Sequence, residues 1–186
     1  MQLRNYCEYI NTECDNSNSP VLTVKALKLD GKNSLKESLQ LANVKTCDYL
    51  RRKQGKALLI ECSNLVRQVE NEREYYAQAQ QAVAGQDRQL RKQVEKRFNP
   101  ESRIREEMRY KCIHSLLLLH RLADRLGFRL DHKFSNGVVF IIAICTESKA
   151  DVMAFQGLVT KLKPTLQGIA DSVKVVPAND LPALLA

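Results

Sequence analysis

Two acidic residues, Asp48 and Glu61, are the side chains in this sequence whose spacing best suits chemistry. They belong to two short apolar runs, residues 46–51 and 56–62, which a Gln-Gly pair at 54–55 separates. A two-residue hairpin turn at that pair places Asp48 directly opposite Glu61 on one face, with Cβ atoms roughly 5 Å apart. Like charges at that distance repel each other unless a cation lies between them, and carboxylate oxygens suit Mg²⁺ or Mn²⁺. The spacing therefore predicts a divalent-metal site at Asp48 and Glu61.

The elements that would position these acids follow from the hydrophobic pattern. Residues 21–29 are β-branched and leucine-rich, which predicts a strand. Ser34 followed by Glu37 is a capping-box pattern, which predicts a short helix over about 35–42. The second apolar run of the hairpin has no polar interruption, so we expect the hairpin to lie inside a sheet rather than at its edge.

The C-terminal third continues the same sheet. Residues 137–145 form the most apolar stretch and predict a central strand, residues about 149–169 a helix, and residues 172–178 a last strand. A strand, helix and strand of these lengths predict a parallel crossover. The expected fold class is α/β, with a mixed central sheet flanked by helices and a long helical-hairpin insertion.

The insertion is the stretch from residue 64 to 126, which reads as helix with a break at Asn99-Pro100, a good N-cap followed by a good first helical residue. We expect an antiparallel arm whose polar tip lies near residues 85–105, and which either docks a partner or packs along the domain. One domain over 1–186 would then contain a first core part at 21–63, the arm at 64–126 and a second core part at 137–178.

The sequence resembles the PD-(D/E)XK nuclease superfamily in two respects. It has a hairpin of the form CDYL, basic turn and LLIEC, and this hairpin is followed by a helix and later by a strand, helix and strand. The resemblance implies a mixed sheet flanked by helices, and a divalent metal that activates water against a phosphodiester. It makes Asp48 the first acid of the family's motif and Glu61 the acid of its E-x-K triplet. Glu37 would be the additional glutamate that many members carry, or simply part of the capping box.

This chain departs from the family at one position of the triplet. Ser63 stands where the family has lysine, and serine cannot supply the positive charge that orients water or offsets charge on the phosphate. Some members move that cation to a neighbouring element, for which Arg67, Lys25 and Lys28 are candidates here. Ser63 remains a site position by the resemblance, although it also suits a helix N-cap.

Two groups of basic residues could meet nucleic-acid phosphates in addition to Arg67. The first, at the hairpin turn, consists of Arg51, Arg52, Lys53 and Lys56. The second repeats every four residues along the first helix of the arm and consists of Arg88, Lys92 and Lys96. Solvated surface charge is the alternative interpretation of both groups.

The composition is that of a globular domain. The 186 residues include 29 Lys and Arg against 21 Asp and Glu, a net charge of +8, with 44% hydrophobic and 27% charged residues. These values exclude a disordered, collagen-like or disulfide-scaffold chain. The basic excess suits nucleic acid or an acidic protein surface.

The six cysteines are scattered without a CxxC pair, so we expect reduced thiols rather than a zinc site. No window approaches the roughly 18 apolar residues needed to cross a bilayer, and polar residues interrupt the start of the chain where a signal peptide would be apolar. We therefore expect a cytoplasmic protein with no membrane partner.

Two functions from different classes remain open. The first is a nuclease-like protein that acts on or binds nucleic acid, with Mg²⁺ or Mn²⁺ at Asp48 and Glu61 if it is an active phosphodiesterase. The second is a catalytically inactive interaction subunit of a DNA-processing or phage-defence assembly, which binds a protein partner through the 64–126 helices. Ser63 leaves the choice between them open.

Overall fold

The computed structural model describes residues 2–12, 21–41, 43–126, 134–146 and 149–186. Among them, six strands form one sheet in the order β1-β2-β3-β4-β5-β6. Their bounds are β1 Cys7–Asn11, β2 Val21–Lys28, β3 Tyr49–Lys53, β4 Lys56–Ser63, β5 Val138–Ile144 and β6 Ser172–Pro177. The pairs from β1 to β4 are antiparallel, and β4, β5 and β6 run parallel. The predicted α/β class and the parallel crossover are confirmed.

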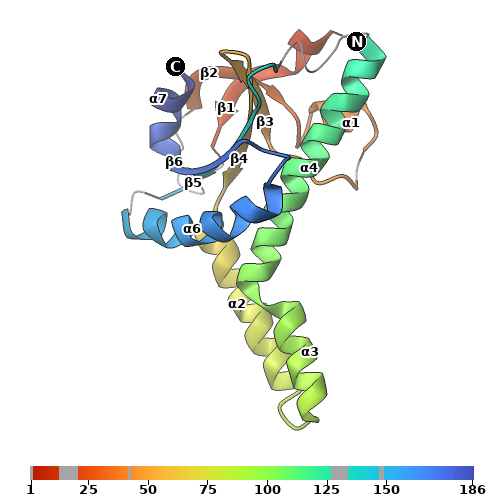
Figure 1. The fold of residues 1–186 in the computed structure, drawn as a ribbon, viewed down its shortest axis with the longest axis vertical. Helices are drawn as coiled ribbons and strands as arrows, with labels where there is room; N and C mark the ends of the chain where they lie inside the picture. Colours follow the sequence, from red (N-terminus) through yellow and green to blue (C-terminus); the bar gives the residue numbers. More distant parts are fainter. Residues whose placement is uncertain (1, 13–20, 42, 127–133, 147–148) are drawn as a thin grey trace.

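Helices cover both faces of this sheet (Figure 1). The α-helices are α1 Leu35–Ser38, α2 Leu65–Ala82, α3 Arg88–Phe98, α4 Pro100–Leu126, α6 Lys149–Leu162 and α7 Leu181–Leu185. The short 3-10 turns are η1 Leu3–Tyr6, η2 Lys163–Leu166 and η3 Ala178–Asp180. One apolar cluster joins the sheet to α4 and α6, and a smaller cluster on the opposite face joins it to α7.

Strand β4 is central because both of its faces are apolar. Ala57 and Leu59 belong to the cluster under α4 and α6, whereas Leu58 and Ile60 belong to the cluster under α7. Successive side chains of a strand point to opposite faces, so an unbroken apolar run has to be covered on both sides. The predicted interior position of the hairpin is confirmed.

The register of the hairpin also follows the prediction. Lys53 pairs with Lys56, and Tyr49 pairs with Ile60. Gln54 and Gly55 both have positive φ, 49° and 73°, which is the condition for a two-residue I′ turn. Gly55 adopts this conformation at little steric cost, and Gln54 adopts it in the left-handed region that non-glycine residues seldom occupy.

Four segments differ from the expectation. Helix α1 ends at Ser38 rather than near residue 42, which itself lies outside the described residues. Helix α6 ends at Leu162 rather than near residue 169, and Pro164 lies in the 3-10 turn that follows it. Strand β1 and helix α7 were not expected from the hydrophobic pattern.

The arm is an antiparallel pair of helices, α2 and α3, that projects from the end of β4 (Figure 1). Its tip is the turn at 83–87, where the side chain of Asp87 accepts hydrogen bonds from two backbone N–H groups of α3. The break at Asn99-Pro100 lies at the base instead, because α4 continues from there over the sheet. The predicted tip near 85–105 is therefore wrong in its second half, although Asn99 is an N-cap that accepts from Ser102 N–H at 2.9 Å.

The thiols differ in part from the prediction. Cys7, Cys47, Cys62 and Cys112 are free, whereas Cys145 takes part in a disulfide. Cys14 lies outside the described residues. The expectation that every cysteine is reduced is thus wrong for Cys145, and a cytoplasmic location stays a prediction. None of the helices in the described ranges has the length and apolar character needed to span a membrane.

Candidate active site

Asp48 immediately precedes β3 and is held between two neighbouring strands. Its carbonyl accepts a hydrogen bond from Leu29 N–H at 2.7 Å, and its carboxylate Oδ2 accepts one from Cys62 N–H at 2.7 Å. Tyr49 and Ile60 are the last pair of the β3–β4 ladder, and Asp48, in a bend, and Glu61 each lie one residue beyond it, close enough for the charge of Asp48 to raise the pKa of Glu61. The structure thus brings the two predicted acids together at the end of the hairpin where β4 leads into α2.

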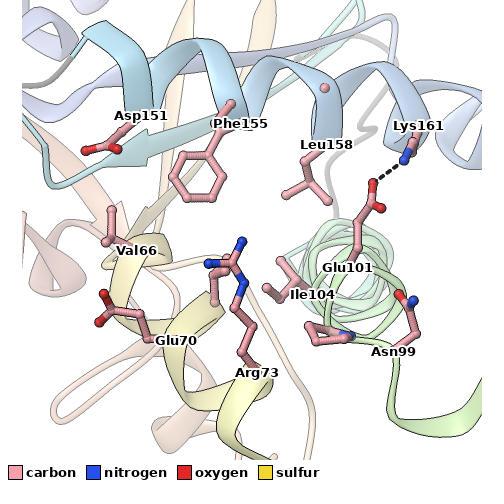
Figure 2. A pocket seen from close by; sticks show the side chains of 14 residues that line it. Val66, Glu70, Arg73, Asn99, Glu101, Ile104, Asp151, Phe155, Leu158 and Lys161 are labelled. Carbon is pink, nitrogen blue, oxygen red and sulfur yellow. Dashed lines mark ion pairs between the residues drawn. The ribbon is translucent and has the colours of Figure 1, made fainter. Parts of the chain in front are cut away.

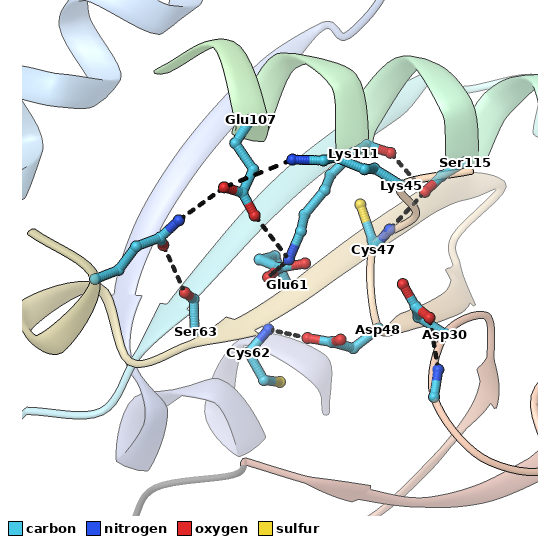
Figure 3. A network of polar contacts seen from close by, with 12 residues as sticks. Asp30, Lys45, Cys47, Asp48, Glu61, Cys62, Ser63, Glu107, Lys111 and Ser115 are labelled. Carbon is cyan, nitrogen blue, oxygen red and sulfur yellow. Dashed lines mark hydrogen bonds and ion pairs between the residues drawn. The ribbon is translucent and has the colours of Figure 1, made fainter. Parts of the chain in front are cut away.

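Glu61 is buried, and its partner comes from a distant helix. Its side chain lies beneath α4, where Oε1 accepts a hydrogen bond from Lys111 Nζ (Figure 3). Only 2% of the Glu61 side chain and 18% of the Lys111 side chain are exposed. The same Lys111 Nζ lies 3.9 Å from Oε1 of Glu107, so one ammonium group faces two carboxylates.

Helix α4 presents Lys111 to the sheet because Lys111 and Ser115 lie among apolar side chains on its buried face. Ile104, Met108 and Cys112 are fully or almost fully buried on this face, and Lys111 precedes Cys112 directly. One turn later, the Ser115 hydroxyl donates to Lys111 C=O at 2.7 Å. The same hydroxyl accepts a hydrogen bond at 2.8 Å from the backbone N–H of Cys47, the residue before Asp48. This hydroxyl ties the segment that carries Asp48 to the turn that carries Lys111.

The charges perturb one another strongly in this buried setting. Burial, followed by the charge of Asp48, raises the pKa of Glu61 from 4.5 to about 8, against the lowering effect of Lys111. Burial lowers the pKa of Lys111, but Glu61 and Asp48 outweigh it, so this pKa lies above its ordinary value. The cluster therefore binds protons more tightly than its separate members would.

Comparison with known protein families, with curated proteins and with solved structures gives no significant match. The resemblance to the PD-(D/E)XK superfamily thus stays a prediction that depends on these residues.

Glu37 does not join the acidic pair. Its backbone N–H donates to Ser34 Oγ at 3.2 Å, and its carboxylate accepts from the N–H of Asn33, which is the capping box of α1. The interpretation of Glu37 as an additional site glutamate is corrected accordingly, because both ends of this residue serve the helix start.

The cation beside Glu61 is not one of those predicted. Lys28 forms an ion pair with Glu8 at 3.0 Å, and Lys25 lies over the ring of Tyr9. Arg67 is exposed in the first turn of α2, where its N–H donates to the N-cap Asn64. Lys111 occupies the place that these candidates were expected to fill.

Ser63 keeps its place beside the site but is not the N-cap of α2, which is Asn64. On a strand, residues two apart point to the same face, so Ser63 follows Glu61 on the side of α4. Its hydroxyl donates to Gln68 Oε1 at 3.4 Å. Ser63 therefore faces the same polar cluster without bringing a charge to it.

The basic hairpin turn lies at the wrong end of the strands to serve this site. Lys53 precedes the turn and Lys56 follows it, whereas Asp48 and Glu61 lie about 16 Å away, five residues along the hairpin from these lysines. Arg51 donates to the carbonyl of Lys25, and Lys53 donates to the carbonyl of Leu184. The group of Arg51, Arg52, Lys53 and Lys56 at the turn therefore does not surround the acids, and its contact with nucleic-acid phosphates stays a prediction.

The second basic group is exposed on the arm. Helix α3 has no buried residue, and none of its basic side chains forms an ion pair with a residue in the described ranges. These side chains are Arg88, Arg91, Lys92, Lys96 and Arg97. Only one acid, Glu95, offsets them within the helix, so α3 is a strongly basic surface.

A separate cavity of about 690 Å³ lies between α2, α4 and α6 (Figure 2). Val66, Ile104, Phe155 and Leu158 are among its lining residues, and an ion pair between Glu101 and Lys161 at 2.6 Å lies at one side. Asp48, Glu61 and Lys111 do not line this cavity. The polar cluster and the cavity are therefore two different features of the molecule.

Two observations bear on whether the acids could hold a metal ion. Within the described ranges, no group of three or more His, Cys, Asp and Glu side chains is arranged for a metal, so protein ligands would be few. On the other hand, Glu61 Oε2 is buried and accepts no hydrogen bond from any described residue. A buried carboxylate oxygen without a donor is costly, and a cation with its own water ligands would satisfy it.

Proposed function

We propose that this chain is a nuclease-like protein whose metal-dependent phosphodiester-cleaving site consists of Asp48, Glu61 and Lys111. The observation that carries the proposal is the position of Lys111 Nζ on the carboxylate of Glu61. The resemblance requires two acids and one cation, and the β3–β4 hairpin with the residue before it supplies only the acids. Lys111 supplies the missing charge from α4.

Asp48 and Glu61 are the residues that would hold Mg²⁺ or Mn²⁺. Their oxygens are hard ligands, and the unsatisfied Oε2 of Glu61 fits such a role. When bound, a divalent cation lowers the pKa of a coordinated water and offsets charge on the phosphate. The N–H of Cys62 restrains Asp48 Oδ2, which limits the rotation of that carboxylate.

Lys111 is suited to charge stabilisation at the phosphate. Its ammonium group has three donors, of which Glu61 takes one, so further donors can reach a water molecule or a phosphate oxygen. Because Lys111 is partly buried, the electrostatic interaction of its ammonium group with a phosphate is stronger than the same interaction in bulk water. Lys111 would therefore do the work of the lysine that Ser63 replaces.

Cleavage should depend on both acids. Plasmid, single-stranded DNA and RNA are incubated with the purified protein in Mg²⁺ and in Mn²⁺, beside Asp48→Asn, Glu61→Gln and the exposed control Glu106→Gln. We expect the two site variants to lose at least about 100-fold in rate, since each loses a charge at the reacting centre, and the control to cut normally. Equal inertness of all four proteins, with no metal binding in calorimetry, would end the catalytic proposal in favour of the interaction subunit.

Helix α3 is proposed to hold the nucleic-acid backbone. Reversal of Arg88, Lys92 and Lys96 to Glu should weaken binding of a labelled oligonucleotide by at least about 10-fold at low salt and flatten its salt dependence, because fewer counterions are released. The matched control reverses three exposed lysines away from the arm, Lys32, Lys163 and Lys174. Equal losses in both triple variants would show that only net charge matters, and unchanged binding would remove α3 from the interface.

A further inference from the structure

A chain of polar contacts leads from the position of the missing lysine to Lys111. Ser63 Oγ contacts Gln68 Oε1 at 3.4 Å, and Gln68 Nε2 contacts Glu107 Oε2 at 2.9 Å. The other oxygen of Glu107 lies 3.9 Å from Lys111 Nζ. The chain thus crosses from β4 through α2 to α4 (Figure 3).

The chemistry of these groups gives each contact its direction. An ionised carboxylate only accepts hydrogen bonds, so the Gln68 amide has to turn its NH₂ group toward Glu107. Its carbonyl oxygen then faces Ser63, whose hydroxyl donates to it. Two neighbours therefore hold the amide in one orientation, and the amide holds Glu107.

Lys111 needs such support because Glu61 cannot serve it alone. A lysine side chain is a flexible four-carbon stem, and its ammonium group is a point charge with no preferred plane. Under the proposed function, the oxygens of Glu61 are also the ligands of a cation, which repels an ammonium group. Glu107 is the second carboxylate against Lys111, and it lies on the same helix one turn earlier.

We propose that Glu107 and Gln68 are positioning residues for Lys111. Glu107 keeps the ammonium group at the site while Glu61 serves the metal, and Gln68 fixes the carboxylate of Glu107. The inference depends on the proposed function, since the reaction is what Lys111 is positioned for. It also gives Ser63 a role as the start of this chain instead of a catalytic one.

The test compares cleavage and binding in the 186-residue chain. Glu107→Gln should lower kcat about 10-fold or more, with KM and oligonucleotide affinity in Ca²⁺ unchanged within about twofold, as for partners that orient an active group. Glu107→Asp, which keeps the charge, should recover part of that loss. Gln68→Leu should lower kcat several-fold, and the Gln68→Leu/Glu107→Gln double variant should be no slower than Glu107→Gln, because both act through one chain.

The exposed neighbour supplies the matched control, since Glu106→Gln makes the same substitution one residue away and should leave kcat unchanged. Wild-type cleavage together with a Glu107→Gln rate equal to that of wild type would overturn the positioning role and leave the proposed function standing. Multiplicative losses in the double variant would show that Gln68 does not act through Glu107. A wild-type protein that cuts nothing would overturn both proposals, while non-additive melting midpoints of the same variants would still verify the contact chain itself.

Discussion

Lys111→Met is expected to lower the free energy of unfolding by about 3 kcal/mol at about pH 8, because it leaves the Glu61 carboxylate buried without its cation. Methionine keeps most of the apolar stem of lysine, so the loss comes from charge and not from packing volume. The double variant Glu61→Met/Lys111→Met removes both charges and should recover more than half of the loss. Urea unfolding followed by circular dichroism measures all three proteins.

The pH dependence of this effect has a definite sign. The pKa of Glu61 is raised from 4.5 to about 8, so between these values the folded state keeps a proton that the unfolded chain releases. The free energy of unfolding of the wild type should therefore fall as pH rises through this window. Without Lys111 the carboxyl group is still harder to ionise, and the cost of Lys111→Met should be smaller at about pH 5.5 than at about pH 8.5.

The double variant is the control for that slope, since it lacks the titrating carboxyl group. A Lys111→Met variant as stable as the wild type, or a cost that does not change with pH, would contradict the buried ion pair. Recovery in the double variant is what separates the loss of a charge partner from a general defect of α4.

The acidic pair could be predicted from the sequence because it depends on local geometry. The turn at 54–55 and the two-residue period of strands determine which residue faces Asp48, and only a few residues separate the turn from each acid. The capping box at Ser34 and Glu37 was readable for the same reason. In both cases the interacting groups belong to one short segment.

The cation could not be predicted in this way, since Lys111 lies 50 residues from Glu61 on a helix that crosses the sheet. Which turn of α4 meets the end of β4 depends on the packing of the whole arm and its base. One local signal was present, because Lys111 lies between Met108 and Ser115 on the face that also carries Ile104 and Cys112. A lysine at the border of a buried stripe is a candidate partner for a buried acid.

The break inside the arm was missed because the apolar stripe continues across it. Val83 and Leu90 keep the seven-residue spacing of the preceding helix, so periodicity alone predicts one long helix. Gly85 and Asp87 interrupt it in the structure, where Asp87 caps a new helix. Here the short-range capping signal outweighs the longer pattern.

Lys111→Met should also abolish cleavage, and a lysine at position 63 should restore part of it. Removal of a charge that stabilises the transition state costs about 100-fold or more in rate. Ser63 follows Glu61 on the same face of β4, and it stands where the resemblance expects the lysine of the triplet. Ser63→Lys would therefore return an ammonium group to the site from the strand instead of from α4.

The most direct test that Asp48, Glu61 and Lys111 form one phosphodiester-cleaving site is single-turnover cleavage of one labelled DNA in Mn²⁺. The proteins compared are the wild type, Lys111→Met and Ser63→Lys/Lys111→Met. Circular dichroism first establishes that each protein is folded at the assay pH, about 7, where the stability cost is moderate. We predict cleavage by the wild type, a loss of at least about 100-fold in Lys111→Met, and recovery of at least about 10-fold in the double variant. A folded Lys111→Met protein that cuts as fast as the wild type would contradict the account.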